Sequence, residues 1–422
     1  MGAATTPGHA ARAGKTTLAV LALTLALAYG IWYAYSVLLV ALLDDFGWSR
    51  STVAGAFSLF AVVHGGCNPL IGMLCDRMAP AAISAVASIV LGVALFACSL
   101  VQAPWQLYLA FGGLTAVSVA ACGWVPAVVQ VQRRFPHRLG FAIGIVSSGV
   151  GVGMFVVVPL CQALIEAAGW RFAFRALGVL AWVIILPSAL YLLRGTPRTA
   201  VPRAAVATDA ATQTAAGALA PRSITLREAA RTLPFWLIVA AFFFGSLCSQ
   251  TLQVHQVAFL VDHGIAALAA ASVVGVVGLA SIVGKTGGGW LSDRVERELV
   301  YVAGVAVLVA SVFALFAVGR HTSQPGAYGF AVLLGIGYSA TAALVPAMVS
   351  DRFQGRHFGA ILGIGLLGSA AGSAFGPWLG GYLFDLTGSY TLPFGIAAAS
   401  GVVAGVAGWV ARVLRVRAAR CA

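Results

Sequence analysis

The sequence predicts an all-α membrane protein, with twelve transmembrane helices in two six-helix bundles related by pseudo-two-fold symmetry. Three observations lead to this prediction. First, 60% of the 422 residues are hydrophobic and only 9% are charged, a composition far from that of a water-soluble domain. Second, the apolar residues form segments of membrane-spanning length, which is about 20 residues. Third, the string Gly-x-Leu-x-Asp-Arg occurs twice, at residues 72–77 and 289–294.

Twelve apolar segments are predicted to cross the membrane. They are predicted as helices because continuous apolar runs with Gly and other small residues suit helix-on-helix packing, and the alternating pattern of barrel strands is absent. Each Gly-x-Leu-x-Asp-Arg string closes one of these runs. In chain order the predicted spans are residues 18–43, 51–75, 81–101, 105–131, 140–166, 170–193, 235–261, 266–291, 299–319, 325–350, 357–384 and 390–414.

The two halves of the chain repeat one another. The two Gly-x-Leu-x-Asp-Arg strings start 217 residues apart (289 minus 72), and five further pairs of residues keep nearly the same offset. Self-similarity at a fixed offset indicates that one structural unit was duplicated. The pairs are Pro126 and Pro346, Arg134-Phe135 and Arg352-Phe353, Arg138 and Arg356, Pro159 and Pro377, and Gly169 and Gly388.

The repeat also sets the expected domains. We expect a cytoplasmic N-terminal tail at residues 1–16, a six-helix bundle at 17–194, a cytoplasmic linker at 195–232, a second six-helix bundle at 233–414 and a basic cytoplasmic tail at 415–422. The linker is rich in Ala, Thr, Pro and Arg and is the one long polar connection in the sequence.

Basic residues predict the orientation in the membrane. The formal net charge is +13, and most Lys and Arg residues fall in loops on the side of the two termini. The opposite side has only Arg50, Arg171, Arg175 and Arg320. By the positive-inside rule both termini are cytoplasmic. The charge therefore reports topology and gives no reason to expect a nucleic-acid partner. The large excess of Arg over Lys suggests a bacterial source, and hence the bacterial inner membrane.

The repeat, the spans and the Asp-Arg strings resemble the major facilitator superfamily over nearly the whole chain. Three further strings are similar to its monocarboxylate porter and oxalate/formate antiporter branch. They are Phe46-Gly47-Trp48-Ser49-Arg50, Phe135-x-x-Arg138-x-Gly140-x-Ala142-x-Gly144, and Gly376-Pro377-x-x-Gly380 with Asp385-x-Thr387-Gly388-Ser389-Tyr390. The resemblance implies a carrier that rocks two bundles about a central site.

The resemblance also implies roles for individual residues. Asp76, Arg77, Asp293 and Arg294 match the gating motif, whose Asp contacts the start of a helix in the other bundle. In the relatives, an Arg of the eighth helix pairs with the substrate carboxylate, and this position is Lys285 here. The chain departs from the family at Ser281, where animal monocarboxylate porters have an Asp, and it lacks the Lys that oxalate carriers have in the eleventh helix.

Lys285 is also the strongest candidate for substrate binding on physical grounds. It precedes Asp293 by eight residues, or about 12 Å of helix, which places it near the bilayer midplane. An unpaired lysine there costs roughly 2.5–3.5 kcal/mol, and no Asp or Glu lies deep in a predicted span. A bound anion is therefore the expected counter-charge. The alternative is a lysine that extends along the helix to the cytoplasmic face.

Polar residues of other spans are expected to share the central cavity. His64 also lies near the midplane and could carry a proton, or it could be a neutral structural histidine. Gln250 and Gln253 belong to a polar stripe that either faces the cavity or joins helices. Tyr33 could donate to a carboxylate or pack against other aromatic rings, and Asn68 is the repeat counterpart of Lys285.

These observations predict a secondary transporter of a small organic monocarboxylate, coupled to a proton, that works by alternating access. The alternatives are a carboxylate exchanger, a carrier of another organic anion, and a non-transporting receptor of the same fold. The sequence contains no catalytic constellation, metal-binding motif or cofactor motif, so we expect neither an enzyme nor a cofactor. The expected partners are the carboxylate, a proton and the lipid bilayer, without nucleic acid or an obligate protein partner.

Overall fold

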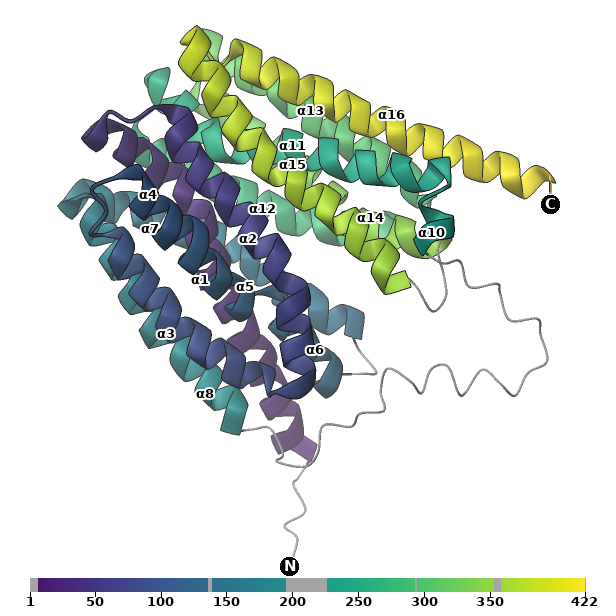
Figure 1. The fold of residues 1–422 in the computed structure, drawn as a ribbon, viewed down its shortest axis with the longest axis horizontal. Coiled ribbons are helices and arrows are strands. Elements are labelled where there is room, and N and C mark those ends of the chain that lie inside the picture. The colour runs from purple at the N-terminus through teal and green to yellow at the C-terminus, as the bar shows by residue number, and fades with distance from the viewer. Residues whose placement is uncertain (1–6, 136–138, 195–225, 293, 353–357, 422) are drawn as a thin grey trace, which may run out of the picture.

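The computed structural model describes residues 7–135, 139–194, 226–292, 294–352 and 358–421. The helices of the first half of the chain form one bundle and those of the second half form another, and the two bundles lie against each other (Figure 1). The expected site residue Asp293 lies outside the described residues, as do Arg138, Phe353 and Arg356 of the repeat.

Helices account for almost all of the described chain. The first bundle consists of α1 (Pro7–Phe46), α2 (Arg50–Arg77), α3 (Pro80–Cys98), α4 (Pro104–Leu107), the π-helical η1 (Tyr108–Thr115), α5 (Ala116–Cys122), α6 (Trp124–Arg134), α7 (Leu139–Leu180), the π-helical η3 (Ala181–Ile185) and α8 (Leu186–Arg194). The short α10 (Leu226–Ala229) precedes the second bundle. That bundle consists of α11 (Leu233–Asp262), α12 (Ala267–Ser292), α13 (Arg297–His321), α14 (Gln324–Arg352), α15 (Phe358–Thr387) and α16 (Thr391–Cys421).

The twelve predicted spans can be identified among these elements. Nine helical stretches of the described chain are long and apolar enough to cross a membrane. One of them, Ala142–Arg194, contains two crossings because the backbone of Gly169 (φ 82°, ψ 166°) is not helical. Dividing this stretch, and adding α14 and α15 with their 29 and 30 residues, gives twelve. The fold class predicted from the sequence is therefore confirmed.

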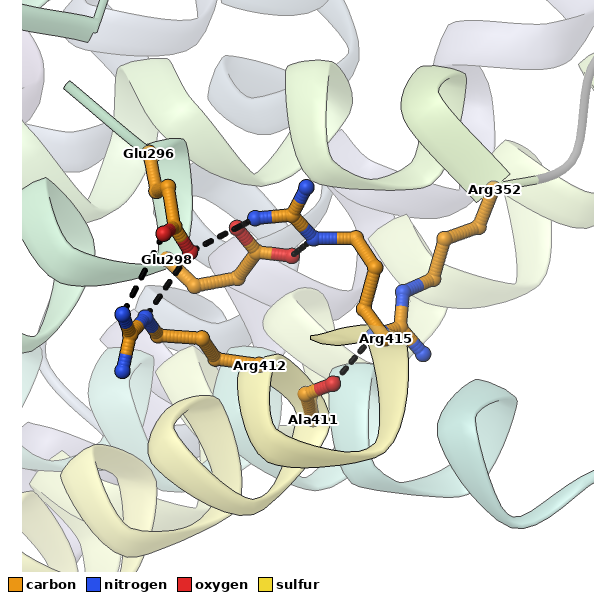
Figure 2. Close-up of polar contacts among 6 residues, drawn as sticks. All are labelled: Glu296, Glu298, Arg352, Ala411, Arg412 and Arg415. Carbon is orange, nitrogen blue, oxygen red and sulfur yellow. Dashed lines mark hydrogen bonds and ion pairs between the residues drawn. The ribbon is translucent and has the colours of Figure 1, made fainter. Parts of the chain in front are cut away.

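Helix ends differ from the expected boundaries in three places. α1 already begins at Pro7, within the expected N-terminal tail, and α16 continues to Cys421, within the expected basic tail. α10 lies inside the expected linker, most of which (195–225) is outside the described residues. The end of α16 extends because its polar residues are paired: Arg412 and Arg415 bind Glu296 and Glu298 at the start of α13 (Figure 2).

The duplication predicted from sequence is visible in the backbone. Within the described ranges, the four glycines with positive φ lie between helical segments and form two repeat pairs. Gly47 (φ 63°) and Gly264 (φ 82°) follow the first helix of each half, and Gly169 (φ 82°) and Gly388 (φ 65°) separate the last two helices of each half. Only glycine adopts this conformation without strain, so the turns constrain the sequence at matching positions.

Two arginines of the repeat make the same contact in each bundle. Arg134 donates a hydrogen bond to the backbone carbonyl of Leu192 (2.8 Å) in α8. Arg352 donates to the carbonyl of Ala411 in α16 (Figure 2). Each arginine thus joins the fourth span of its bundle to the sixth. This contact gives a physical reason for the Arg-Phe pair that the sequence repeats.

Glycines allow the closest helix contacts within and between the bundles. A Cβ atom at Gly149 or Gly153 of α7 would overlap the α1 backbone, and one at Gly372 of α15 would overlap the α11 backbone. Between the bundles, Gly151 of α7 faces Gly278 of α12. Gly287 and Gly289 of α12 do not mark such a contact, because no heavy atom would lie within 4 Å of a Cβ there.

Candidate functional site

Lys285 lies on α12 at the interface of the two bundles. Its side chain is half-buried, and its Nζ atom is 5.8 Å from the centroid of the Tyr338 ring on α14. The Tyr338 hydroxyl in turn lies 4.0 Å from the Met154 sulfur on α7, in the other bundle. Lys285 makes no ion pair or hydrogen bond within the described part of the chain. Its ammonium group is therefore held by an aromatic face and has no counter-charge.

Tyr33 connects this lysine region to the first bundle. The Tyr33 side chain, on α1, lies beside Tyr338 and Gln253 of the second bundle. Although Gln253 is close, the geometry leaves both polar atoms of its amide without a hydrogen bond. Of the two uses expected for Tyr33, a position at the boundary between the bundles fits a ligand contact, but packing against Trp32 at 6.1 Å between ring centroids also occurs.

The polar stripe of the seventh span, now α11, divides into two parts. Ser246 bonds to the Ser369 hydroxyl on α15 (2.6 Å) and so joins two helices. The three glutamines do not join helices. Gln250, Gln253 and Gln256 each have at least one amide atom that is buried without a partner, and Gln253 is only 3% exposed. A stripe of buried, unpaired amides is unusual, since most buried polar groups are hydrogen-bonded.

His64 lies in an aromatic enclosure on α2. Its ring centroid is 4.7 Å from that of Trp32, 6.0 Å from Phe60 and 6.2 Å from Tyr29. The residue is 8% exposed, and its Nε2 atom has no hydrogen-bond partner. This ring nitrogen therefore does not join helices through a hydrogen bond. Sequence analysis missed Trp32, whose Nε1 atom is also unpaired; its only signal was its place beside Tyr33.

At the end of the molecule where the two termini lie, the hydrogen bonds and ion pairs of the described residues join helices of the same bundle. Asp76 and Arg77 are exposed and form no hydrogen bond or ion pair among the described residues. Arg294 is exposed too and stacks on Trp290 of its own helix (3.8 Å to the ring centroid). Asn68 is half-buried and has no hydrogen-bond partner within the described ranges. Of the expected gating residues, the three that the structure describes (Asp76, Arg77 and Arg294) therefore make no hydrogen bond or ion pair with the other bundle.

The opposite end is closed by contacts that sequence analysis did not anticipate. Arg50, at the start of α2, donates to both carboxylate oxygens of Asp262 at the end of α11 (3.0 and 2.8 Å). It also donates to the Tyr390 hydroxyl (2.6 Å), and its guanidinium lies 4.0 Å from the centroid of the Phe384 ring. The backbone N–H groups of Arg50 and Ser51 donate to Asp385 of α15, both at 2.8 Å.

We call Arg50, Asp262, Asp385 and Tyr390 the Arg50 latch. A carboxylate from one bundle binds the N-terminus of a helix in the other, where the helix dipole favours negative charge. This is the chemistry that the resemblance implied for Asp76 and Asp293 at the other end. Two sequence signals pointed to the latch: Arg50 is one of few basic residues on its side, and Asp385 ends the eleventh span.

Metal and thiol chemistry find no support in the described residues. No group of three or more His, Cys, Asp or Glu side chains there could hold a metal ion. Cys67, Cys75, Cys98, Cys122, Cys161 and Cys248 are all free, and all except Cys67 are buried. His255 is buried with both ring nitrogens occupied, by the Tyr390 hydroxyl (3.1 Å) and the Pro377 carbonyl (2.8 Å). His255 thus hydrogen-bonds to Tyr390 of the Arg50 latch, and both of its ring nitrogens are already in use.

Comparisons with known proteins agree with the membrane-transporter fold described above. The profile of the Major Facilitator Superfamily matches residues 21–319 and 256–420. Monocarboxylate transporter 12-B of Danio rerio is 28% identical over 348 residues, which are 78% of this chain and 72% of that protein. Monocarboxylate transporter 13 of Rattus norvegicus is 28% identical over 379 residues, 89% and 83% of the two chains. The uncharacterized MFS-type transporter YcxA of Bacillus subtilis is 21% identical over 372 residues, 85% of each.

Among solved structures, the fold is similar to that of a bacterial homolog of the human lysosomal transporter Spinster in its inward-facing, unoccupied conformation. The TM-score is 0.68 over 94% of this chain and 96% of that one, at 18% sequence identity. At this identity the likeness concerns the fold alone.

Proposed function

The chain belongs to the major facilitator superfamily of transporters, and we propose that it carries a small organic monocarboxylate across the membrane together with a proton. The observation that supports this proposal most directly is Lys285, a half-buried cation without a counter-charge among the described residues. A carboxylate would supply that charge in a site of low dielectric, where a charge-assisted hydrogen bond is strong. The monocarboxylate transporters among its relatives carry that substrate class in their names.

The two ends of the molecule support alternating access as the mechanism. The Arg50 latch joins the bundles at one end, whereas the described polar contacts at the end of the termini stay within each bundle. Rocking of one bundle against the other would break the latch and bring Asp76 and Arg77 against the second bundle. With the termini in the cytoplasm of a bacterial cell, as the positive-inside rule predicts, the described conformation is the one open to the cytoplasm.

Proton coupling would make transport electroneutral. A monoanion that entered alone would work against a negative-inside potential, at about 2.3 kcal/mol for each 100 mV. His64 has an unpaired ring nitrogen and lies within the first bundle next to Trp32, so it is our candidate for carrying the proton. Its neighbours are aromatic rings, and a proton there would be most stable with the carboxylate bound nearby.

Uptake of a labelled monocarboxylate by proteoliposomes tests the proposal. We expect Lys285→Ala to abolish uptake and Lys285→Arg to retain part of it, because arginine also pairs with carboxylates. The matched control is Lys15→Ala, since Lys15 is the other lysine of the chain and is exposed on α1. Full uptake by Lys285→Ala with unchanged apparent affinity would show that Lys285 does not bind the substrate. It would also refute the argument for a monocarboxylate.

A further inference from the structure

Almost all unpaired polar atoms of the described interior gather in one place. Seven buried side-chain atoms lack a hydrogen-bond partner there, and all except Gln130 Oε1 belong to residues that adjoin Tyr33 or are linked to it through Trp32 or Gln253. We call these residues the Tyr33 cluster: Trp32, Tyr33, His64, Gln250, Gln253 and Gln256.

The contacts show that the cluster is one continuous region. Trp32 adjoins both Tyr33 and His64, at 6.1 and 4.7 Å between ring centroids. Tyr33 adjoins Gln253, and the side-chain amide of Gln256 donates a hydrogen bond to the backbone carbonyl of Gln253 (3.2 Å). Gln250 lies one helical turn before Gln253. Two bundles thus contribute unpaired groups to the same volume, next to the Tyr338 ring that contacts Lys285.

The unpaired groups have a definite chemistry. The Trp32 indole can only donate a hydrogen bond, and the free atoms of Gln250 and Gln256 are acceptors. The Gln253 amide lies beside the Tyr33 hydroxyl, but neither of its polar atoms makes a well-aligned hydrogen bond, so it offers a donor and an acceptor together. None of these groups is charged. Proteins pair the large majority of buried side-chain polar atoms, so this many unpaired atoms in one region indicates a missing partner that both accepts and donates.

We propose that the transported monocarboxylate carries, at the end away from its carboxylate, an uncharged group that both donates and accepts hydrogen bonds, such as a primary amide. This inference rests on the proposed function, because it places the carboxylate at Lys285 and the other end in the Tyr33 cluster. Tyr338, which adjoins both Lys285 and Tyr33, lies between the two ends. A plain fatty acid leaves the cluster unpaired, and a dicarboxylate brings a second charge with no second cation to meet it among the described groups.

Competition against labelled-substrate uptake tests this inference with three ligands of equal chain length: pentanoate, the monoamide of glutarate, and glutarate. For the wild-type protein we expect the monoamide to inhibit about tenfold more strongly than pentanoate, the factor that corresponds to one net hydrogen bond at the upper end of the usual range. Glutarate should inhibit less than the monoamide. In Gln253→Leu, and separately in Trp32→Phe, the preference for the monoamide over pentanoate should fall to about twofold or less.

Two variants separate the inference from the proposed function. Gln162→Leu removes a buried glutamine that is paired with Glu166 on its own helix, outside the cluster, and it should keep the tenfold preference. Lys285→Arg, which should retain part of the uptake, should change the inhibition by both monoanions by the same factor. Equal inhibition by pentanoate and the monoamide in the wild type would overturn the inference and assign the cluster to bound water. A preference that survives in both cluster variants would overturn it as well. If no carboxylate competes at all, the proposed function itself fails.

Discussion

Removal of the Arg50 side chain should open the end of the protein that the structure shows closed. Arg50 binds three partners in the second bundle: Asp262, Tyr390 and the Phe384 ring. All of these contacts break when the bundles separate there. Arg50→Ala should therefore destabilise the closed arrangement of this end without disturbing either bundle, because the backbone N–H groups of residues 50 and 51 keep their bonds to Asp385.

The size of the effect can be worked out from the contacts. The ion pair with Asp262 is worth about 1 kcal/mol, because the two side chains are 15% and 36% exposed and exposed pairs rarely exceed this value. The bond to Tyr390 adds about 1.5 kcal/mol, and the stacking on Phe384 adds about 1 kcal/mol. Since such contributions are not fully additive, we expect about 2–3.5 kcal/mol in total, which lowers the ratio of closed to open molecules roughly 30- to 400-fold.

Double electron–electron resonance between spin labels at Gln102 and Gln324 would measure this ratio. Both residues are exposed, and they lie on different bundles near the latch end. The matched control is Arg171→Ala, which removes an ion pair to Asp45 (2.9 Å) and stacking on Trp170 (4.1 Å), both within the first bundle. We expect a longer-distance population in Arg50→Ala only. An unchanged distance distribution, or the same change in the control, would refute the role of the latch.

Four further outcomes are expected. Uptake should rise with an inward proton gradient, and His64→Gln should weaken this dependence; in proteoliposomes with voltage and pH set separately, uptake that ignores the pH gradient but responds to internal carboxylate would indicate exchange. Acetate should compete far better than oxalate or malonate, because a second carboxylate costs several kcal/mol to desolvate without a partner, and equal competition would contradict the single-cation site. Gly153→Ala should lower the melting temperature because its Cβ overlaps α1, whereas Gly144→Ala should be neutral or stabilising by about 0.5–1 kcal/mol, since no atom lies near its Cβ; equal effects would refute the packing argument. Arg415→Gln should cost about 2 kcal/mol in thermal unfolding, less than a fully buried pair, because Arg415 is 39% exposed while its partner Glu298 is only 4% exposed; an unchanged melting temperature would mean that Glu298 is paired otherwise.

The sequence by itself determined the membrane-spanning architecture. Membrane spans are recognisable locally, because every backbone group inside a bilayer must be satisfied within its own helix and the side chains must be apolar over that length. The duplication was equally visible, since matched turns and matched contacts demand the same residues twice. Gly47 with Gly264 and Arg134 with Arg352 show why: each pair meets the same backbone geometry or carbonyl in both halves.

The sequence also singled out Lys285, His64 and the glutamine stripe, because charged and polar groups are conspicuous in an apolar span. It could not say which of them lacked partners. Ser246 and Gln253 belong to one stripe, yet the first is paired across helices and the second is not. The sequence could not identify Trp32 as an unpaired polar group, because only the structure shows that no acceptor lies near its indole N–H.

Only the tertiary structure decided which charged residues hold the bundles together. The sequence pointed to Asp76, Arg77, Asp293 and Arg294, but the described members of that set make no contact with the other bundle. Arg50 and Asp385, 335 residues apart, make it instead. In the alternating-access cycle that we propose, one end closes at a time, so a gate at the other end would be paired in one conformation and free in the other. Local patterns fix what each helix is, whereas the position of one bundle against the other fixes which ion pairs exist.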